Sequence, residues 1–176
     1  MRRKLLLGAI VAVVPVLAIA GFAAAGGGQS SLAELRDATA KYHDIDVALA
    51  THDAVELPQT AAYGGGTCIA DAGGAGAMGI HLLLQDRLDD TLVPTEPEVL
   101  LYEKRNDGSR KLTGVEYVVA GGPQPTLYGQ AFAWTNLGRY GSPDVNVWTL
   151  HVWAWKPNPS DPLGIFSPWN PRVTCE

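Results

Sequence analysis

The chain has 176 residues, of which 47% are hydrophobic and 18% are charged. Residues 26–176 contain ten basic and 18 acidic residues, which gives them a formal net charge of −8. An acidic chain with scattered cations lacks the basic surface that binds nucleic acid or anionic lipid, so the charge argues against both partners. Residues 26–176 are numerous enough for one domain with a hydrophobic core.

The first 25 residues have the three parts of an export signal. Three basic residues precede a long apolar run that ends in small residues. This pattern predicts a signal peptide over 1–25, cleaved after Ala25, and therefore a secreted, extracytoplasmic protein. The apolar run is also about as long as a membrane-spanning helix, so a retained N-terminal anchor is the alternative. Glycine-rich residues 26–30 predict a flexible lead-in to a single globular domain over 31–176.

Two cysteines, Cys68 and Cys175, follow the predicted signal peptide. An even number of cysteines in an oxidising compartment favours a disulfide over free catalytic or metal-binding thiols. In the chain-entropy model, closing a loop of about a hundred residues contributes about 4–5 kcal/mol to stability. The bond would also hold the C-terminus against the start of the folded core.

One amphipathic helix is predicted over about 31–50. It begins with Ser31 and Glu34, which have the spacing of a capping box. His43 flanks its apolar face, and Asp46 is close enough along the helix to reach the imidazole. The apolar residues recur at steps of three and four, as expected for a helix that packs on one side: Leu32, Leu35, Tyr42, Ile45 and Leu49.

The rest of the domain is predicted to be strands joined by long, glycine-rich loops. Four apolar or alternating runs indicate strands: Met78–Leu84, Glu98–Lys104, Lys111–Val119 and Val145–Trp155. The expected fold is therefore α+β, with one N-terminal helix packed on an antiparallel sheet of four or more strands, long loops and one disulfide.

A β-hairpin is predicted around Asp107-Gly108, because Asp-Gly between apolar runs is a strong hairpin signal. A two-residue turn at this point sets the register of the two strands. It pairs Glu103 with Leu112, and Val99 with Glu116.

Residues 74–79 formally match the dinucleotide-binding pattern G-x-G-x-x-G. That motif requires a strand before it and a helix after it. Here a strand-like run follows and none precedes, so the glycines do not predict a dinucleotide site, and no cofactor-binding motif is assigned.

Several segments together resemble a group of secreted bacterial proteins that is common in actinobacteria. The resemblance covers most of the chain from His43 to Cys175. It implies export and a shared fold, and it implies no activity. The segments that carry it are Met78-Gly79-Ile80-His81, Pro97–Glu103, Gly114-Val115-Glu116-Tyr117, Leu150–Pro159 and Asn170–Cys175.

Three histidines and one glutamate are the candidate site residues. His81 and His151 each lie on a predicted strand among apolar neighbours, and a buried imidazole needs partners for both ring nitrogens. Glu116 lies in the middle of a strand, where an isolated carboxylate is costly to bury. His43 approaches from the helix. Imidazole and carboxylate ligands suit a divalent transition metal such as zinc, copper, manganese or iron, so these four residues predict a metal site.

Other functions remain open. The histidines can equally be core residues bonded to backbone carbonyls, because no ligand spacing here matches a known metal motif. An extracytoplasmic hydrolase would use His81 or His151 as a base with a carboxylate such as Glu116. Trp153 and Trp155, on one predicted strand face, would suit stacking on a sugar or an apolar ligand. The last alternative is a structural or cell-surface interaction protein without a site. The leading hypothesis is a module for a small ligand or a metal, centred on His81 and His151.

Overall fold

The computed structural model describes residues 27–57, 67–89, 91–140 and 144–175. The predicted signal peptide, 1–25, lies outside them. The helical elements are α1 (Gly27–Thr39), η1 (Ala40–His43), α2 (Ile45–Thr51), η3 (Gln85–Arg87), η4 (Leu137–Tyr140) and η5 (Gly164–Phe166). The strands are β1 (Ala54–Glu56), β2 (Cys68–Ala70), β3 (Ala77–Leu84), β4 (Val99–Lys104), β5 (Arg110–Val119), β6 (Thr126–Leu127), β7 (Gln130–Ala131), β8 (Ala133–Asn136) and β9 (Asn146–Val152).

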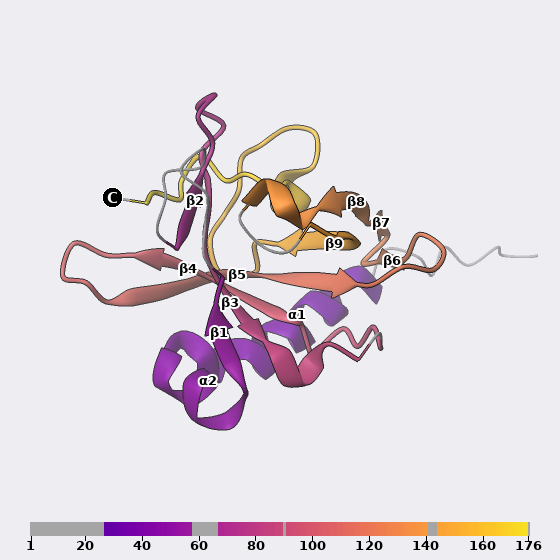
Figure 1. Ribbon diagram of the computed structural model, residues 1–176, viewed down its shortest axis with the longest axis horizontal. Helices are drawn as coiled ribbons and strands as arrows, with labels where there is room; N and C mark the ends of the chain where they lie inside the picture. The colour runs from indigo at the N-terminus through magenta and orange to yellow at the C-terminus, as the bar shows by residue number, and fades with distance from the viewer. Residues whose placement is uncertain (1–26, 58–66, 90, 141–143, 176) are drawn as a thin grey trace, which may run out of the picture.

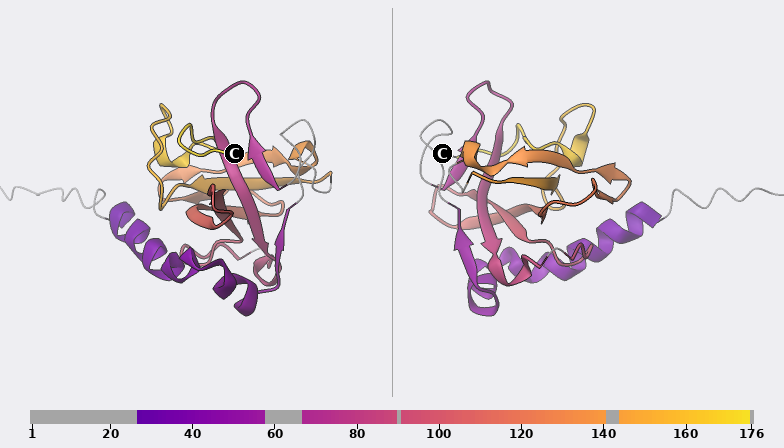
Figure 2. Two further views of the ribbon diagram at one scale, coloured as in Figure 1. Left: turned by 90° about the vertical axis from the view of Figure 1, so that its left-hand side faces the viewer. Right: turned by 45° about the vertical axis from the view of Figure 1, so that its right-hand side comes forward.

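The main sheet has seven antiparallel strands in the order β1-β3-β4-β5-β9-β8, and β2 pairs with β3 beside this path. Strands β6 and β7 form a separate two-stranded sheet. The helices α1 and α2 lie under one face of the main sheet, and the yellow C-terminal segment lies over the other (Figures 1 and 2). The prediction of an antiparallel sheet with one disulfide is therefore confirmed.

The predicted helix over 31–50 is divided into α1, η1 and α2. It begins at Gly27, within the segment 26–30 that we expected to be a flexible lead-in. The division follows from Asp44, whose backbone is extended and whose Oδ1 accepts a hydrogen bond from the N–H of Asp46, which caps α2. The break rotates the apolar stripe, so that Ala48 is buried where Leu49 was expected, and Leu49 is 51% exposed.

Two separate apolar clusters pack on the two faces of the sheet. The helix-side cluster contains Leu35, Tyr42 and Ala48 together with strand residues such as Leu82 and Leu100. The opposite cluster is smaller and contains Ala77, Val99, Leu101, Trp153 and Val173. Both faces of the central strands are therefore covered, as their nearly continuous apolar sequence requires.

The predicted hairpin joins β4 and β5, but its turn differs from the expectation. Val99 pairs with Glu116 as predicted, whereas Glu103 pairs with Lys111 rather than with Leu112. The loop is longer than two residues, because the N–H of Arg105 bonds the carbonyl of Ser109. A bulge opposite Leu101 and Tyr102 then absorbs one residue and restores the register towards Glu116.

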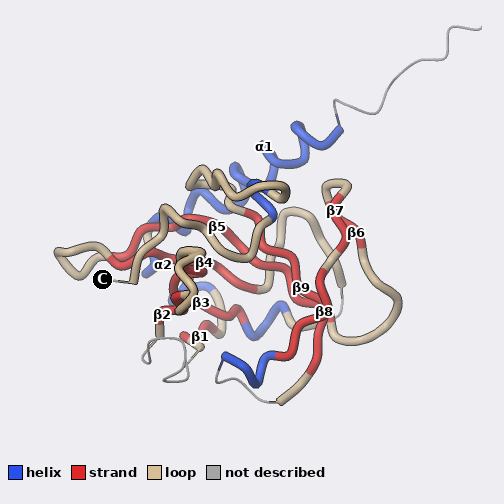
Figure 3. Tube along the Cα trace, turned by 90° about the horizontal axis from the view of Figure 1, so that it is seen from above, coloured by secondary structure: helices blue, strands red, loops and turns tan. Residues whose placement is uncertain are grey.

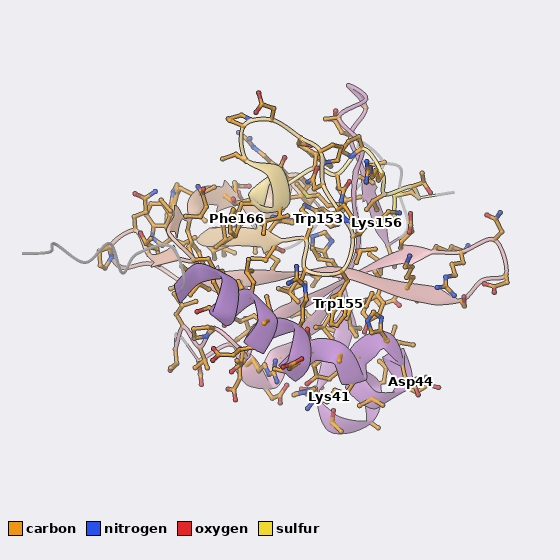
Figure 4. All side chains as sticks on the ribbon, turned by 180° about the vertical axis from the view of Figure 1, so that it is seen from behind. Lys41, Asp44, Trp153, Trp155, Lys156 and Phe166 are labelled. Carbon is orange, nitrogen blue, oxygen red and sulfur yellow. A yellow bond between two sulfur atoms is a disulfide. The ribbon has the colours of Figure 1, made fainter. Side chains whose placement is uncertain are left out.

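Strand β9 ends at Val152, three residues earlier than predicted. The N–H of Ala154 turns back to the carbonyl of Val152, which ends the alternation of faces. Trp153 packs in the small cluster on the C-terminal side, whereas Trp155 packs with the helix-side cluster (Figure 4). The expectation that Trp153 and Trp155 share a face is wrong, and neither forms a stacking platform with the other.

The C-terminus is tied to the sheet by a disulfide and by backbone pairing. Cys68 on β2 is bonded to Cys175, as predicted. Ala77 and Asn170 exchange two backbone hydrogen bonds of 3.1 Å, which attach the C-terminal segment to the first residue of β3. Seen from above, this segment passes over the sheet (Figure 3). It therefore forms part of the cover on the face that carries the candidate site.

Candidate metal centre

The sheet register places His81, Glu116 and His151 on one face. Glu116 on β5 lies directly opposite His151 on β9 and opposite Val99 on β4. His81 on β3 lies opposite Leu101, which faces the same way as Val99 because side chains alternate along a strand. The Glu116 side chain therefore reaches across β4 to meet the His81 ring.

The three side chains converge at distances that suit shared ligation. His81 Nε2 lies 3.5 Å from Glu116 Oε2, and His151 Nδ1 lies 3.6 Å from Glu116 Oε1. One ligand atom from each residue falls within 4.8 Å of the other two. These distances are longer than ordinary hydrogen bonds. Two ligand atoms that bind one ion at about 2.1 Å with tetrahedral angles lie about 3.4 Å apart. Each of the two observed distances is close to this value, although each involves a different oxygen of Glu116.

All three side chains are buried, with exposed fractions of 4% for His81, 6% for Glu116 and 6% for His151. His81 Nδ1 donates to the carbonyl of Gly79 at 3.3 Å, which directs the Nε2 lone pair towards Glu116. His151 Nε2 is buried without a hydrogen-bond partner among the described residues. The nitrogen of His151 that faces Glu116 is Nδ1, so the unpaired Nε2 is the other ring nitrogen.

Burial keeps the three groups uncharged in the metal-free protein. It lowers the pKa of His81 to about 4 and that of His151 to about 3. Burial, followed by the nearby Glu98 carboxyl, raises the pKa of Glu116 to about 8. At neutral pH the cluster therefore consists of two neutral imidazoles and one carboxylic acid. The imidazoles are then in the form that coordinates a metal, whereas Glu116 must release a proton to do so.

A cavity of about 420 Å³ opens beside the cluster. His81, Glu116 and His151 all line it, together with Met78 and Trp169. This volume lies within the range of small-molecule sites. A ligand in the cavity would have direct access to an ion held by the three side chains.

His43 is the one predicted ligand that the structure does not bring to this cluster. Its side chain is exposed on the helix side, and its ring packs edge-on against Trp155, with the ring centroids 4.4 Å apart. Trp155 belongs to the helix-side cluster, on the opposite face of the sheet from His81. The reason is that η1, which carries His43, packs on the helix side of the sheet, whereas the ligand cluster lies on the other side.

Three other acidic residues, Asp44, Glu98 and Glu103, have structural partners. Asp44 caps α2, and Glu103 Oε1 binds the ammonium of Lys156 at 2.5 Å. Glu98 is 2% exposed and accepts a hydrogen bond of 2.9 Å from the N–H of Val118. Burial raises the pKa of Glu98 to about 7. Among the described carboxylates, Glu116 is the one that lies in a cluster with the two histidines.

A second polar network on the helix side was not found from the sequence. His52 Nε2 lies 2.6 Å from the Tyr42 hydroxyl, and His52 Nδ1 lies 2.8 Å from Asp86 Oδ2. Arg87 donates to the same hydroxyl at 3.3 Å. Tyr42 is fully buried whereas Asp86 is exposed, so the network links the end of α2 to η3 from the core out to the surface. No sequence signal joins these residues, because 34 positions separate His52 from Asp86.

Aromatic side chains also meet at the edge of the sheet. The rings of Trp134 on β8 and Trp148 on β9 are 4.7 Å apart at an angle of 57°. Trp134 is 52% exposed, whereas Trp148 donates to the carbonyl of Gly122. The tilt between the rings means that they do not form a flat platform for a sugar ring.

Comparisons with known proteins do not assign this chain to a family. No protein-family model, curated protein or solved structure matches this chain. The resemblance to secreted actinobacterial proteins therefore stays a prediction. Within the described residues, every helix is too short or too polar to cross a membrane.

Proposed function

We propose that this protein is an exported module that binds one divalent transition-metal ion through His81, Glu116 and His151. The observation that carries the proposal is the convergence of three buried ligand groups from three strands, at 3.5 and 3.6 Å, beside a cavity. Two imidazoles and a carboxylate suit zinc and iron in particular. Export is supported by the disulfide, since such bonds persist in oxidising compartments.

The proposed ligands have the arrangement of a site with an open coordination position. His81 Nε2 and one Glu116 oxygen face each other, and His151 supplies the third atom. Three protein ligands leave a tetrahedral ion with one position for water or an external ligand. The cavity lies beside that position. The bond from His81 to Gly79 then acts as the second layer of support that fixes the ring.

Metal titration tests the proposal directly. Protein purified without a histidine tag and stripped of metal should bind one equivalent of Zn²⁺, and Co²⁺ should produce the visible absorption of a four-coordinate ion. The variants His81→Gln, His151→Gln and Glu116→Gln should each lose at least about a hundredfold in Zn²⁺ affinity, because each removes a ligand.

The control is His43→Gln, which changes an exposed ring on the other face and should bind Zn²⁺ like the wild type. Less than about a tenth of an equivalent of bound metal in the wild type would refute the proposal. If the three variants then only lowered stability, the histidines would belong to the core.

A metal-dependent hydrolase is the second candidate. The observation that favours it is the cavity of about 420 Å³ that all three proposed ligands line, since catalytic zinc sites, unlike structural ones, keep a coordination position open to a substrate. An ion there would polarise a carbonyl and lower the pKa of a bound water. Zinc-loaded wild type should then cleave p-nitrophenyl esters, and His81→Gln should lose that activity. Metal binding without hydrolysis would leave only the binding module.

A further inference from the structure

A second cavity adjoins the proposed metal site. It has a volume of about 290 Å³ and shares Leu57, Glu116 and Leu137 with the larger cavity. Glu116 is its single polar lining residue among the described ones. The carboxyl group therefore stands at the boundary between a mixed cavity and a purely apolar one.

The apolar walls follow from the strand register. Leu83, Val99 and Glu116 lie side by side on β3, β4 and β5, and Val118 is two residues beyond Glu116 on the same face. Val147 on β9 extends this surface. Side chains alternate between the two faces of the sheet, and the positions on this face of the cavity carry aliphatic side chains. The exception among them is Glu116, the proposed metal ligand.

The rim of the apolar cavity is open to solvent at two large side chains. Leu88 is 50% exposed and Val145 is 45% exposed. Exposed apolar residues at the mouth of an apolar cavity are typical of a binding site for an apolar group. An alkyl chain that entered the cavity would cover both these exposed residues and the apolar walls.

The net charge of the proposed metal site indicates which polar group a ligand of the two cavities would carry. A divalent ion with two neutral imidazoles and one carboxylate has a net charge of +1, which attracts an anion. We infer, on the basis of the proposed metal site, that the ligand is an amphiphilic carboxylate with a medium-length alkyl chain. Its carboxylate occupies the open position on the ion, and its chain lies along Leu83, Val99 and Val118 in the apolar cavity.

Calorimetric titration of zinc-loaded protein with octanoate and with acetate tests this inference. Each methylene buried contributes about 0.8 kcal/mol, a factor of about four in Kd. Octanoate should therefore bind on the order of a hundredfold or more tightly than acetate. Octanoate that binds no tighter than acetate would overturn the inference.

A matched pair of surface variants tests where the alkyl chain of the ligand lies. Leu88→Asp places a charge at the mouth of the apolar cavity and should weaken octanoate binding at least about tenfold. Leu49→Asp changes a leucine of nearly equal exposure, 51% against 50%, on α2 and should leave octanoate binding unchanged. Val118→Phe should reduce octanoate binding while Zn²⁺ binding is retained. Equal losses in Leu88→Asp and Leu49→Asp would overturn the inference.

Separate titrations distinguish this inference from the proposed function. If Zn²⁺ binds and octanoate does not, the metal site stands and the amphiphile is wrong. If Zn²⁺ does not bind, the proposed function fails, and the carboxylate loses its ion. Equal octanoate affinity in the metal-free and the zinc-loaded protein would overturn the placement of the carboxylate on the metal.

Discussion

Glu116 is the residue on which the proposed site depends most. It meets both imidazoles and borders both cavities. An ionised carboxylate in this position would lack the donors that normally stabilise it, since His81 donates its Nδ1 proton to a backbone carbonyl instead. Burial therefore favours the acid form in the absence of metal. Such a group affects both folding and metal uptake, and it makes stability depend on pH.

In the metal-free protein, Glu116→Gln should change the pH dependence of stability. Burial raises the Glu116 pKa from 4.5 to about 8, so between these values the folded protein keeps a proton that the unfolded chain has released. The contribution of Glu116 to stability therefore falls as the pH rises through this range. The variant should gain on the wild type by up to about 1.4 kcal/mol per pH unit between pH 5 and 8, measured by urea unfolding.

The two histidines act in the opposite direction at lower pH. Burial lowers the pKa of His81 from 6.5 to about 4 and that of His151 to about 3, so below about pH 6.5 the unfolded chain binds protons that the folded protein does not. Their effect lowers stability as the pH falls, in the wild type and in the Glu116 variant alike. Parallel curves for the two proteins between pH 5 and 8 would contradict the buried-acid description of Glu116.

At the scale of elements, β3 is the strand that assembles the site. It pairs with β1, β2 and β4, and its Gly79 carbonyl orients the His81 ring. Gly79 has a φ of +85°, and a Cβ atom there would lie 2.5 Å from the carbonyl oxygen of Tyr102 on β4. Glycine is needed at this position for the backbone conformation and for the close approach of β4. The formal glycine-rich motif of the sequence therefore has a structural role.

Two alanine substitutions separate these two requirements. Gly74→Ala, at a φ of +86° with open space around it, should lower stability by about 1 kcal/mol from backbone strain alone. Gly79→Ala adds the clash with Tyr102 and should lower it by about 3 kcal/mol. Chemical denaturation measures both. Equal losses would show that the approach of β4 adds nothing to the requirement for glycine.

For the molecule as a whole, the disulfide joins the beginning of the sheet to the end of the chain. The bond spans 107 positions and holds the C-terminal segment over the face that carries the site. Val173 in this segment packs against the same small cluster as Leu101 and Trp153. The segment therefore covers part of the face of the sheet that carries the site, and none of its described residues belongs to the ligand cluster.

Replacing both cysteines, as Cys68→Ser with Cys175→Ser, should lower the free energy of unfolding by about 2–5 kcal/mol. Hydrogen exchange should also accelerate at the amide of Ala77, which bonds to Asn170 in the C-terminal segment. The amide of Leu100 on central strand β4 is the internal reference, and it should follow global stability only. Unchanged protection at Ala77 relative to Leu100 would mean that the segment stays attached without the bond.

The sequence by itself determined the four strands β3, β4, β5 and β9, the register near Val99 and Glu116, the disulfide and the choice of His81 and His151 as site candidates. These features depend on local alternation, on a turn signal or on a count of two cysteines, all of which are properties of short segments. The face of His81 followed from the period of two in β3. Proximity to Glu116 and His151 required the additional fact that β4, β5 and β9 are neighbours in the sheet.

Only the tertiary structure decided which way His43 faces, how His52 reaches Asp86, and that an apolar cavity adjoins Glu116. In the sequence, the apolar residues keep their helical spacing past Asp44. In the structure, the helix is interrupted at Asp44, which caps the new helix α2. The bulge opposite Leu101 and Tyr102 compensated a longer turn that the Asp-Gly signal did not predict. In each case the outcome depended on packing between segments that are distant in the sequence. The free energy of that packing exceeds the free energy of the local conformational preferences that a sequence pattern records.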